Sequence, residues 1–482
     1  MITEQNCTML CDFYQLTMGN GYYNTRHADR IAYFDVFFRK VPDGGGYAVC
    51  AGLEQVINYI QGLHFTDDDI QYLRGKKIFS EGFLEYLRDF KFTGDIWAVP
   101  EGTPVFPSEP LLTVRAPAIQ AQLIETMLLL LINHQSLIAT KANRIVRAAQ
   151  GRAISEFGSR RAQGASGAVL GARAAYIGGC AGTACVIADE LYGVPATGTM
   201  AHSWVQMFDS ELEAFRAYAE IYPDSCLLLV DTYDTLRGVK NAITVFKEMR
   251  EKGLKPKGIR LDSGDLAYLS KKAREMLDEA GFEDAMIFAS GDLDEYTIQS
   301  LKLQGARIDC YGVGTKLITS HSNPSLGGVY KICEVEENGV MTPKMKISDN
   351  PAKVTNPGEK RIFRLVSKNN NKAIADVICL ADEKIDESKP YTLIHPEYRW
   401  KTKEVRNFRA KELYRQIYKD GKLVYDLPDL KTIQRRKRES FDEFWDEYKR
   451  LEKPHIYKVD LSEKLYNLKQ KLIDELVGKK GK

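Results

Sequence analysis

Residues 258–265 read Gly-Ile-Arg-Leu-Asp-Ser-Gly-Asp, a short apolar run that ends in polar residues and glycine. The apolar side chains that follow at helical spacing are Leu266, Leu269, Ala273, Met276, Leu277 and Ala280. Gly281 then supplies a helix stop. A short buried strand followed by an amphipathic helix is half of a βαβ unit, so this stretch predicts parallel α/β architecture.

Similar apolar runs recur on both sides of this stretch. They are Ala153 to Phe157, Val194 to Gly198, Leu227 to Val230, Met286 to Ala289 and Ile308 to Val313. From Leu227 onward, and counting the run at Gly258, successive runs start 31, 28 and 22 residues apart. This spacing suits βαβ units of about 30 residues, and it predicts a parallel α/β barrel or an open parallel sheet.

The chain divides by pattern into three predicted domains. Residues 1–134 mix short strands with helices and have a proline-rich stretch from Gly94 to Ala118, which predicts a small α+β sandwich. Residues 135–331 hold the βα repeats. Residues 332–482 form a β-rich and then helical segment, which we expect to pack back on the N-terminal domain.

Composition excludes several classes of protein. With 67 Lys and Arg against 65 Asp and Glu, the net charge of +2 gives no surface field that would recruit nucleic acid or a membrane. The longest apolar run, Met127 to Ile132, is far shorter than the ~20 residues of a membrane helix. Any anionic ligand must therefore be held by a local cluster of basic groups.

The cysteines and the N-terminal residues bear on the compartment. The nine cysteines form no C-x-x-C pair and no zinc-site spacing, and their odd number favours reduced thiols. Met1 to Cys11 shows no basic segment followed by an apolar run, so we expect no secretory signal. These observations predict a cytoplasmic protein.

Candidate binding residues lie at the predicted strand ends, because barrels and open α/β sheets both bind ligands there. Arg160, Arg161 and Arg260 point to an anionic ligand, although internal salt bridges to nearby carboxylates would also account for them. Gly312, Gly314 and Thr315 outline a phosphate cradle with Lys316 as a counter-charge. The alternative is a tight turn that needs glycine only for its backbone.

Carboxylates and one histidine complete the set. Asp231 and Asp262 end strands and favour a site for ribose hydroxyls or Mg²⁺, whereas Asp265 and Asp292 precede helices and resemble N-caps. His202 follows another run. It is either a structural residue or a nucleophile toward phosphorus, and no other histidine stands at zinc-ligand spacing from it.

Six motifs together resemble the nicotinate phosphoribosyltransferase family. They are Asp12-Phe-Tyr-Gln-Leu-Thr-Met18, Glu156-Phe-Gly-Ser-Arg-Arg-Ala162, Gly198-Thr-Met-Ala-His-Ser203, Leu229-Val-Asp-Thr-Tyr233, Ile259-Arg-Leu-Asp-Ser-Gly-Asp265 and Pro324-Ser-Leu-Gly-Gly-Val-Tyr-Lys331. The resemblance implies an irregular α/β barrel of the type II phosphoribosyltransferase kind, with an N-terminal α+β sandwich and a C-terminal segment. It also implies a homodimer with shared active sites.

The resemblance further implies an activity and residue roles. Nicotinate and phosphoribosyl pyrophosphate would yield nicotinate mononucleotide and pyrophosphate in NAD biosynthesis, with ATP hydrolysed through a phosphohistidine at His202. Tyr14 would stack on the pyridine ring, Arg260 and Thr199 would bind nicotinate, and Thr315 in its glycine-rich turn would bind the phosphoribosyl group. By motif position, the substrate rim also includes Arg160, Arg161, Asp231, Asp262, Gly291, Gly312 and Gly314. Mg²⁺ would enter with the substrate phosphates and could contact Asp262.

Three other functions remain open from the sequence. A sister phosphoribosyltransferase could use nicotinamide or quinolinate. Arg260 favours a substrate with a carboxylate, which nicotinamide lacks, and quinolinate has two carboxylates that would require more basic contacts. A barrel-fold binding protein could keep the architecture without turnover. His202, Arg260 and the glycine-rich turn together argue against that last reading.

Overall fold

The structure is a computed structural model that describes residues 6–25, 27–350 and 353–478. It divides into two compact units. We call Ile138–Pro324 the barrel unit, and Met1–Leu137 together with Ser325–Lys482 the sheet unit. No helix among the described residues is both long enough and apolar enough to cross a membrane.

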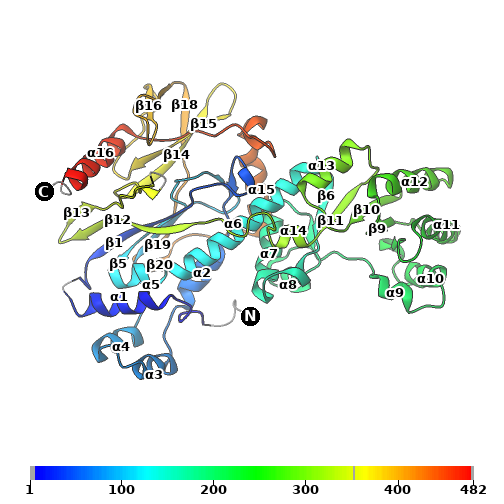
Figure 1. The fold of residues 1–482 in the computed structure, drawn as a ribbon, viewed down its shortest axis with the longest axis horizontal. Coiled ribbons are helices and arrows are strands. Elements are labelled where there is room, and N and C mark those ends of the chain that lie inside the picture. Colours follow the sequence, from blue (N-terminus) through cyan, green and yellow to red (C-terminus); the bar gives the residue numbers. More distant parts are fainter. Residues whose placement is uncertain (1–5, 26, 351–352, 479–482) are drawn as a thin grey trace. The chain divides into compact units, whose positions relative to one another are not determined.

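The strands of the barrel unit follow the predicted apolar runs (Figure 1). They are β6 (Ala153–Glu156), β7 (Gly182–Thr183), β8 (Leu227–Leu229), β9 (Gly258–Leu261), β10 (Met286–Ser290) and β11 (Cys310–Val313). All pair in parallel, in the order β7-β6-β11-β10-β9-β8. Because the first strand, β6, pairs with the last, β11, the strands follow one another in a ring. Among the described residues this ring is interrupted between β7 and β8. The predicted irregular barrel is confirmed.

Helices connect these strands as the apolar spacing predicts. They are α7 (Ala165–Gly178), α8 (Val186–Tyr192), α9 (His202–Gln206), α10 (Glu211–Ile221), α11 (Thr235–Glu251), α12 (Leu266–Glu279), α13 (Glu295–Leu303) and α14 (Thr315–Ile318). Asp234, Asp265 and Asp294 cap α11, α12 and α13 by accepting a backbone N–H of the first turn. The caps fix each helix start close behind its strand.

One predicted strand is wrong. Of the run from Val194 to Gly198, Ala196 alone pairs, in an isolated parallel bridge with Thr183. Pro195 lies inside this run and has no N–H to donate, so a longer ladder cannot form there. The segment instead leads as a loop into α9, which begins at His202.

The sheet unit contains two larger sheets. Within the described residues, one has the strand order β13 (Val340–Pro343), β12 (Val329–Glu337), β1 (Ile31–Phe37), β5 (Leu112–Pro117), β3 (Asp95–Ala98), β19 (Arg415–Lys419) and β20 (Lys422–Leu423). The other has the order β17 (Thr402–Val405), β16 (Tyr391–Ile394), β21 (Val459–Leu461), β15 (Ala373–Leu380), β14 (Lys360–Ser367) and β18 (Phe408–Glu412). Strands from both ends of the chain thus share the first sheet.

Helices and a small ribbon complete the sheet unit. The ribbon pairs β2 (Ala48–Val49) with β4 (Pro104–Val105). The helices are α1 (Phe13–Tyr23), α2 (Leu53–Gly62), α3 (Asp67–Gly75), α4 (Glu81–Arg88), α5 (Ala118–Leu123), α15 (Leu430–Asp442), α16 (Glu463–Gly478) and the first half of α6 (Glu125–Ala148).

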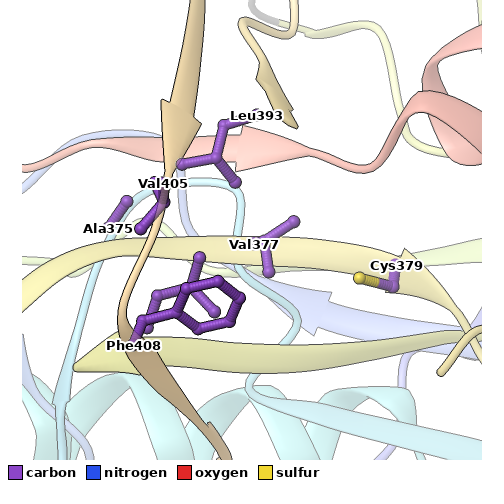
Figure 2. Close-up of a cluster of buried hydrophobic side chains, with 7 residues drawn as sticks. Ala375, Val377, Cys379, Leu393, Val405 and Phe408 are labelled. Atoms are coloured by element: carbon purple, nitrogen blue, oxygen red, sulfur yellow. The ribbon is translucent and has the colours of Figure 1, made fainter. Parts of the chain in front are cut away.

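The second sheet of this unit has its own apolar core. Ala375, Val377 and Cys379 alternate along β15 and therefore share one face, where they pack with side chains of neighbouring strands (Figure 2). Phe408 lies fully buried in the same cluster. Burial of these side chains stabilises the C-terminal strands as part of a folded unit.

Candidate active site

The carboxyl ends of the barrel strands bring together residues that are far apart in the sequence. Parallel strands in a ring end on the same side, so the segments after β6, β8, β9, β10 and β11 meet at one rim. Side-chain contacts among these segments define the candidate site. We call it the barrel rim.

Arg260, on β9, is at the centre of the rim. Its Nε donates to Ser290 Oγ at 2.8 Å, and its Nη2 donates to Asp262 Oδ1 at 2.6 Å. Its Nη1 makes longer contacts, 3.2 Å to Thr199 Oγ1 and 3.3 Å to the carbonyl of Met200. The guanidinium is thus held in place on one edge, and its weakest contacts are those to the loop before α9.

Asp262 links Arg260 to His202. One carboxylate oxygen accepts from Arg260 and from Ser290, and the other lies 3.8 Å from His202 Nε2. Burial alone would raise the pKa of this carboxyl, but the Ser290 hydrogen bond and the Arg260 charge outweigh it and lower the pKa below its ordinary value. Asp262 therefore stays ionised beside the imidazole.

His202 occupies the first turn of α9, where its ring is held from both sides. Its Nδ1 lies 3.1 Å from Thr232 Oγ1, which follows β8, and its Nε2 faces Asp262. The side chain is 40% exposed. An oriented but accessible imidazole can attack a phosphoryl group that enters from solvent.

Asp231, which follows β8, ties two strand ends together. Its Oδ2 accepts the backbone N–H of Asp262 at 3.1 Å and the Ser263 hydroxyl at 2.6 Å. Its Oδ1 is buried and has no hydrogen-bond partner in the described part of the chain. A buried carboxylate oxygen without a donor suits a cation-bearing ligand, such as Mg²⁺ carried by phosphates.

An aromatic layer lies under Arg260. The guanidinium stands 5.8 Å from the centre of the Phe157 ring, and Phe157 stacks on Phe288 with 5.6 Å between ring centres. A Cβ on Gly312 would lie 2.5 Å from the Phe157 ring, so that position admits only glycine. Gly312 is part of β11, so it allows close packing there and does not leave a backbone N–H free for a phosphate.

The proposed counter-charge of the glycine-rich turn is engaged elsewhere. Lys316 Nζ donates to Asp294 Oδ2 at 2.8 Å. Gly314 caps α14, a helix of one turn, and Thr315 begins that helix half-buried. The turn adjoins the aromatic layer, since an added Cβ on Gly314 would lie 3.1 Å from the Phe157 carbonyl.

Gly291 allows two strand ends to approach closely. A Cβ at this position would lie 2.2 Å from the Asp262 carbonyl oxygen, and φ is +101°. Asp292, which we expected to be an N-cap, instead adopts φ 42° in the same tight turn. The cap of α13 is Asp294, because the turn after β10 uses two further residues before the helix begins.

Arg160 and Arg161 lie in a short 3-10 helix at Ser159–Arg161, and both are exposed. Neither side chain has a hydrogen bond or an ion pair with any described residue, so the alternative of internal salt bridges does not hold for these two arginines. Glu156 is buried and accepts instead from Thr183 at 2.6 Å and from the Gly158 N–H, and burial raises its pKa. Both guanidinium groups are available to a ligand.

Tyr14 belongs to the sheet unit rather than to the barrel unit. It lies on α1, is 47% exposed, and donates its hydroxyl to Glu125 Oε2 at 3.1 Å. Burial and the nearby Glu125 charge raise the pKa of Tyr14 to about 12. The phenol is therefore neutral near pH 7, and about half of the residue is open to solvent.

Sequence reasoning did not single out three residues of the rim. Thr232 contacts His202, Ser290 joins Arg260 to Asp262, and Phe157 lies beneath Arg260. Each ends a predicted strand or lies within two residues after one, and that position was the available signal. Among the described residues, no group of three or more His, Cys, Asp or Glu is arranged to hold a metal ion.

Comparison with solved structures defines the class of fold. The chain superposes on the crystal structure of human nicotinic acid phosphoribosyltransferase with a TM-score of 0.86 and 30% identity, over 96% of this chain and 99% of that one. Nicotinate-nucleotide pyrophosphorylase from Pyrococcus furiosus has the same fold, with a TM-score of 0.69 at 23% identity over 91% of this chain and 96% of that one. The fold is thus that of the type II phosphoribosyltransferases.

Sequence comparison identifies the family. Nicotinate phosphoribosyltransferase from Bacillus subtilis is 47% identical over 474 residues, which is 98% of this chain and 96% of the relative. The Caenorhabditis elegans enzyme of the same name is 37% identical over 95% of this chain and 92% of its own. Models of the nicotinate phosphoribosyltransferase N-terminal domain, family and C-terminal domain match residues 9–133, 152–387 and 359–469.

The chain belongs to the nicotinate phosphoribosyltransferase family. It is accordingly an enzyme of phosphoribosyl transfer, and the alternative of a barrel-fold binding protein without turnover is set aside.

Proposed function

We propose that this enzyme joins nicotinate to phosphoribosyl pyrophosphate in NAD biosynthesis by salvage, and that it couples this transfer to ATP hydrolysis through His202. One observation carries the proposal. Arg260 and His202 contact the same carboxylate, Asp262, at the barrel rim of a chain in this family. A carboxylate-binding group and a phosphorus nucleophile thus lie in one site.

Nicotinate binds through its carboxylate to the guanidinium of Arg260. The two long contacts of Nη1, to Thr199 and to the Met200 carbonyl, are the ones that a carboxylate would replace or share. Ser290 and Asp262 hold the opposite edge and keep the plane oriented. Nicotinamide has no carboxylate, so this arrangement disfavours it.

Transfer forms a bond from the pyridine nitrogen to ribose C1 as the bond from C1 to pyrophosphate breaks. Positive charge develops on the sugar and negative charge on the leaving group. Arg160 and Arg161, both unpaired, supply positive charge to the pyrophosphate. Mg²⁺ bound to the phosphates would neutralise further charge, and the free oxygen of Asp231, with Asp262, would hold it.

ATP coupling uses the accessible imidazole of His202. The ring nitrogen attacks the terminal phosphorus, an N–P bond forms, and the P–O bond to ADP breaks; water later hydrolyses the phosphohistidine to phosphate. Because Asp262 contacts both His202 and Arg260, phosphorylation of His202 would alter the charge balance at Arg260. Such coupling changes substrate affinity without entering the bond-forming step.

Tyr14 joins the site as a stacking surface for the pyridine ring, contributed within a homodimer whose subunits share their active sites. Its neutral, half-exposed ring supports this role. The nine free cysteines suit a reducing compartment, and we place the enzyme in the cytoplasm.

The test is His202→Ala, assayed by pyrophosphate release from nicotinate, phosphoribosyl pyrophosphate and ATP. We expect ATP stimulation to disappear while slow ATP-independent transfer persists, because alanine has no nucleophile. His321→Ala, at an exposed histidine of the same unit, is the matched control and should keep full stimulation. Unchanged ATP dependence in His202→Ala would refute the coupling role. Pyrophosphate release with nicotinamide or quinolinate, and none with nicotinate, would refute the assignment of nicotinate as the substrate.

A further inference from the structure

A polar cavity in the sheet unit is lined by no residue of the barrel rim. It has a volume of about 70 Å³. Two buried lysines line it: Lys360 on β14, which is 3% exposed, and Lys469 on α16, which is 7% exposed. Since lysine is almost never fully buried unless it is paired, both require explanation.

Lys360 has a counter-ion. Its Nζ lies 2.8 Å from Asp35 Oδ2 and also donates to the Gly358 carbonyl. Burial disfavours its charge, but the Asp35 carboxylate outweighs that cost and raises the pKa of Lys360. This lysine is a satisfied member of a buried ion pair that links the two sheets.

Lys469 has none. Its Nζ makes a single hydrogen bond within the described residues, 3.0 Å to the neutral Asn356 Oδ1, and no carboxylate lies within ion-pair distance. Burial lowers the pKa of Lys469 to about 8, although the Glu397 charge acts in the opposite direction. The same cavity therefore contains one lysine with a carboxylate partner and one lysine without such a partner, and an anion at Lys469 would offset the cost of burying its charge.

We propose that this cavity is a binding site for a small inorganic oxyanion such as phosphate, held by Lys469. The volume admits several waters or one such ion, since one water needs about 10–15 Å³. It is too small for a nucleotide, because pockets for ligands of that size span roughly 300–1,000 Å³. The Asn356 amide N–H and the Ser108 hydroxyl line the cavity as further donors.

The other charged groups on the cavity differ in their effect on an anion. Asp35 is neutralised by Lys360, and Lys331 adds a third lysine to the lining. Glu397 is exposed and opposes an anion. The inference does not depend on the proposed function, because all of these residues belong to the sheet unit.

The test follows the ionisation of Lys469 itself. Trace acetylation with acetic anhydride across a pH series, read by peptide mass spectrometry, gives the titration of each lysine with and without saturating inorganic phosphate. We expect the Lys469 midpoint to rise by about one pH unit or more with phosphate, as a nearby opposite charge produces. Lys471, 73% exposed on the same helix, is the control and should not move. Because the readout is specific to each residue, phosphate at the barrel rim cannot mimic it.

Variants give a second measure by thermal unfolding with phosphate. Phosphate should raise the Tm of Lys469→Met by less than it raises the Tm of the control Lys471→Met. Glu397→Gln should tighten phosphate binding by a few fold, because it removes a negative charge from the cavity. A Lys469 midpoint that phosphate and sulfate both leave unchanged overturns the proposal. The labelling uses the unaltered protein, so it decides even where Lys469→Met does not fold.

Discussion

Two Arg–Asp pairs of nearly equal length lie in opposite surroundings. Arg260 and Asp262, at the barrel rim, approach to 2.6 Å with side chains 15% and 31% exposed. Arg364 and Asp376, in the sheet unit, approach to 2.7 Å and both are fully buried. The chemical groups are the same, and what differs is the access of water and the identity of the remaining partners.

Both side chains of the buried pair are fully enclosed by protein, and only Arg364 Nη1 lacks a hydrogen-bond partner within the pair's described surroundings. Arg364 also donates to the Pro104 carbonyl at 2.8 Å and lies 4.7 Å from the Phe444 ring centre, and Tyr457 donates to Asp376 at 2.8 Å. Burial, with Asp376 nearby, raises the pKa of Glu109, which is consistent with a protonated carboxyl beside the pair. A ligand has no route to these groups, so their role is structural.

The rim pair is shared among several segments and is open. The other partners of Arg260 are neutral groups in the loop before α9 and at the end of β10. Asp262 is therefore the one carboxylate paired with this guanidinium among the described residues. An ion pair contributes to function where it keeps part of its donor surface exposed.

Arg364→Met should destabilise the fold by about 3–5 kcal/mol, because it leaves the Asp376 carboxylate buried without its partner. Urea unfolding would measure the loss. The control is Arg361→Met on the same strand, whose pair with Glu412 is 38% and 33% exposed and should cost at most about 1 kcal/mol. Equal costs for the two variants would contradict the distinction.

Arg260→Lys should act on catalysis rather than on stability. An ammonium cannot pair bidentately with a carboxylate, so we expect the KM for nicotinate to rise about tenfold or more. Unfolding free energy should change by less than about 1 kcal/mol, because the site is part-exposed. Arg274→Lys, on α12 and paired with Asp278 at 2.7 Å, should leave KM unchanged. An unaltered KM in Arg260→Lys would argue against the carboxylate contact.

The capping assignment after β10 can be checked by two neighbouring substitutions. Asp294→Ala should cost about 1 kcal/mol or more, because α13 loses its cap and Lys316 loses its partner. Asp292→Gly should be neutral or stabilising by up to about 1 kcal/mol, since φ 42° suits glycine. Thermal unfolding of both variants measures this, and a larger loss for Asp292→Gly would restore Asp292 as the cap.

The smallest effect concerns acid stability. Because the pKa of Asp262 is lowered in the folded protein, its carboxylate contributes stability above the ordinary aspartate pKa of about 3.9. That contribution is lost as the pH falls through the lower folded value. The difference in unfolding free energy between the unaltered protein and Asp262→Asn should therefore shrink below about pH 4. A difference that stays constant with acidification would contradict the lowered pKa.

Much of the barrel could be predicted from local patterns. The run at Gly258–Leu261 and the helix from Leu266 have the predicted bounds, and Asp265 caps that helix as expected. The strand predicted at Val194–Gly198 was wrong because one internal proline removes a donor from the ladder. The N-cap predicted at Asp292 was wrong because the length of a turn cannot be derived from residue type.

The sequence by itself determined most of the βα repeats, the position of Arg260 and Asp262 at the end of β9, and the family motifs, because apolar periodicity and motif order are local properties of a chain. Only the tertiary structure decided which partner each charge meets. Asp262 between Arg260 and His202, Arg364 sealed with Asp376, and Lys469 without a counter-ion all depend on side chains that folding brings together or excludes. Burial and pairing are set by non-local contacts, and these determine whether a charge is structural or available to a ligand.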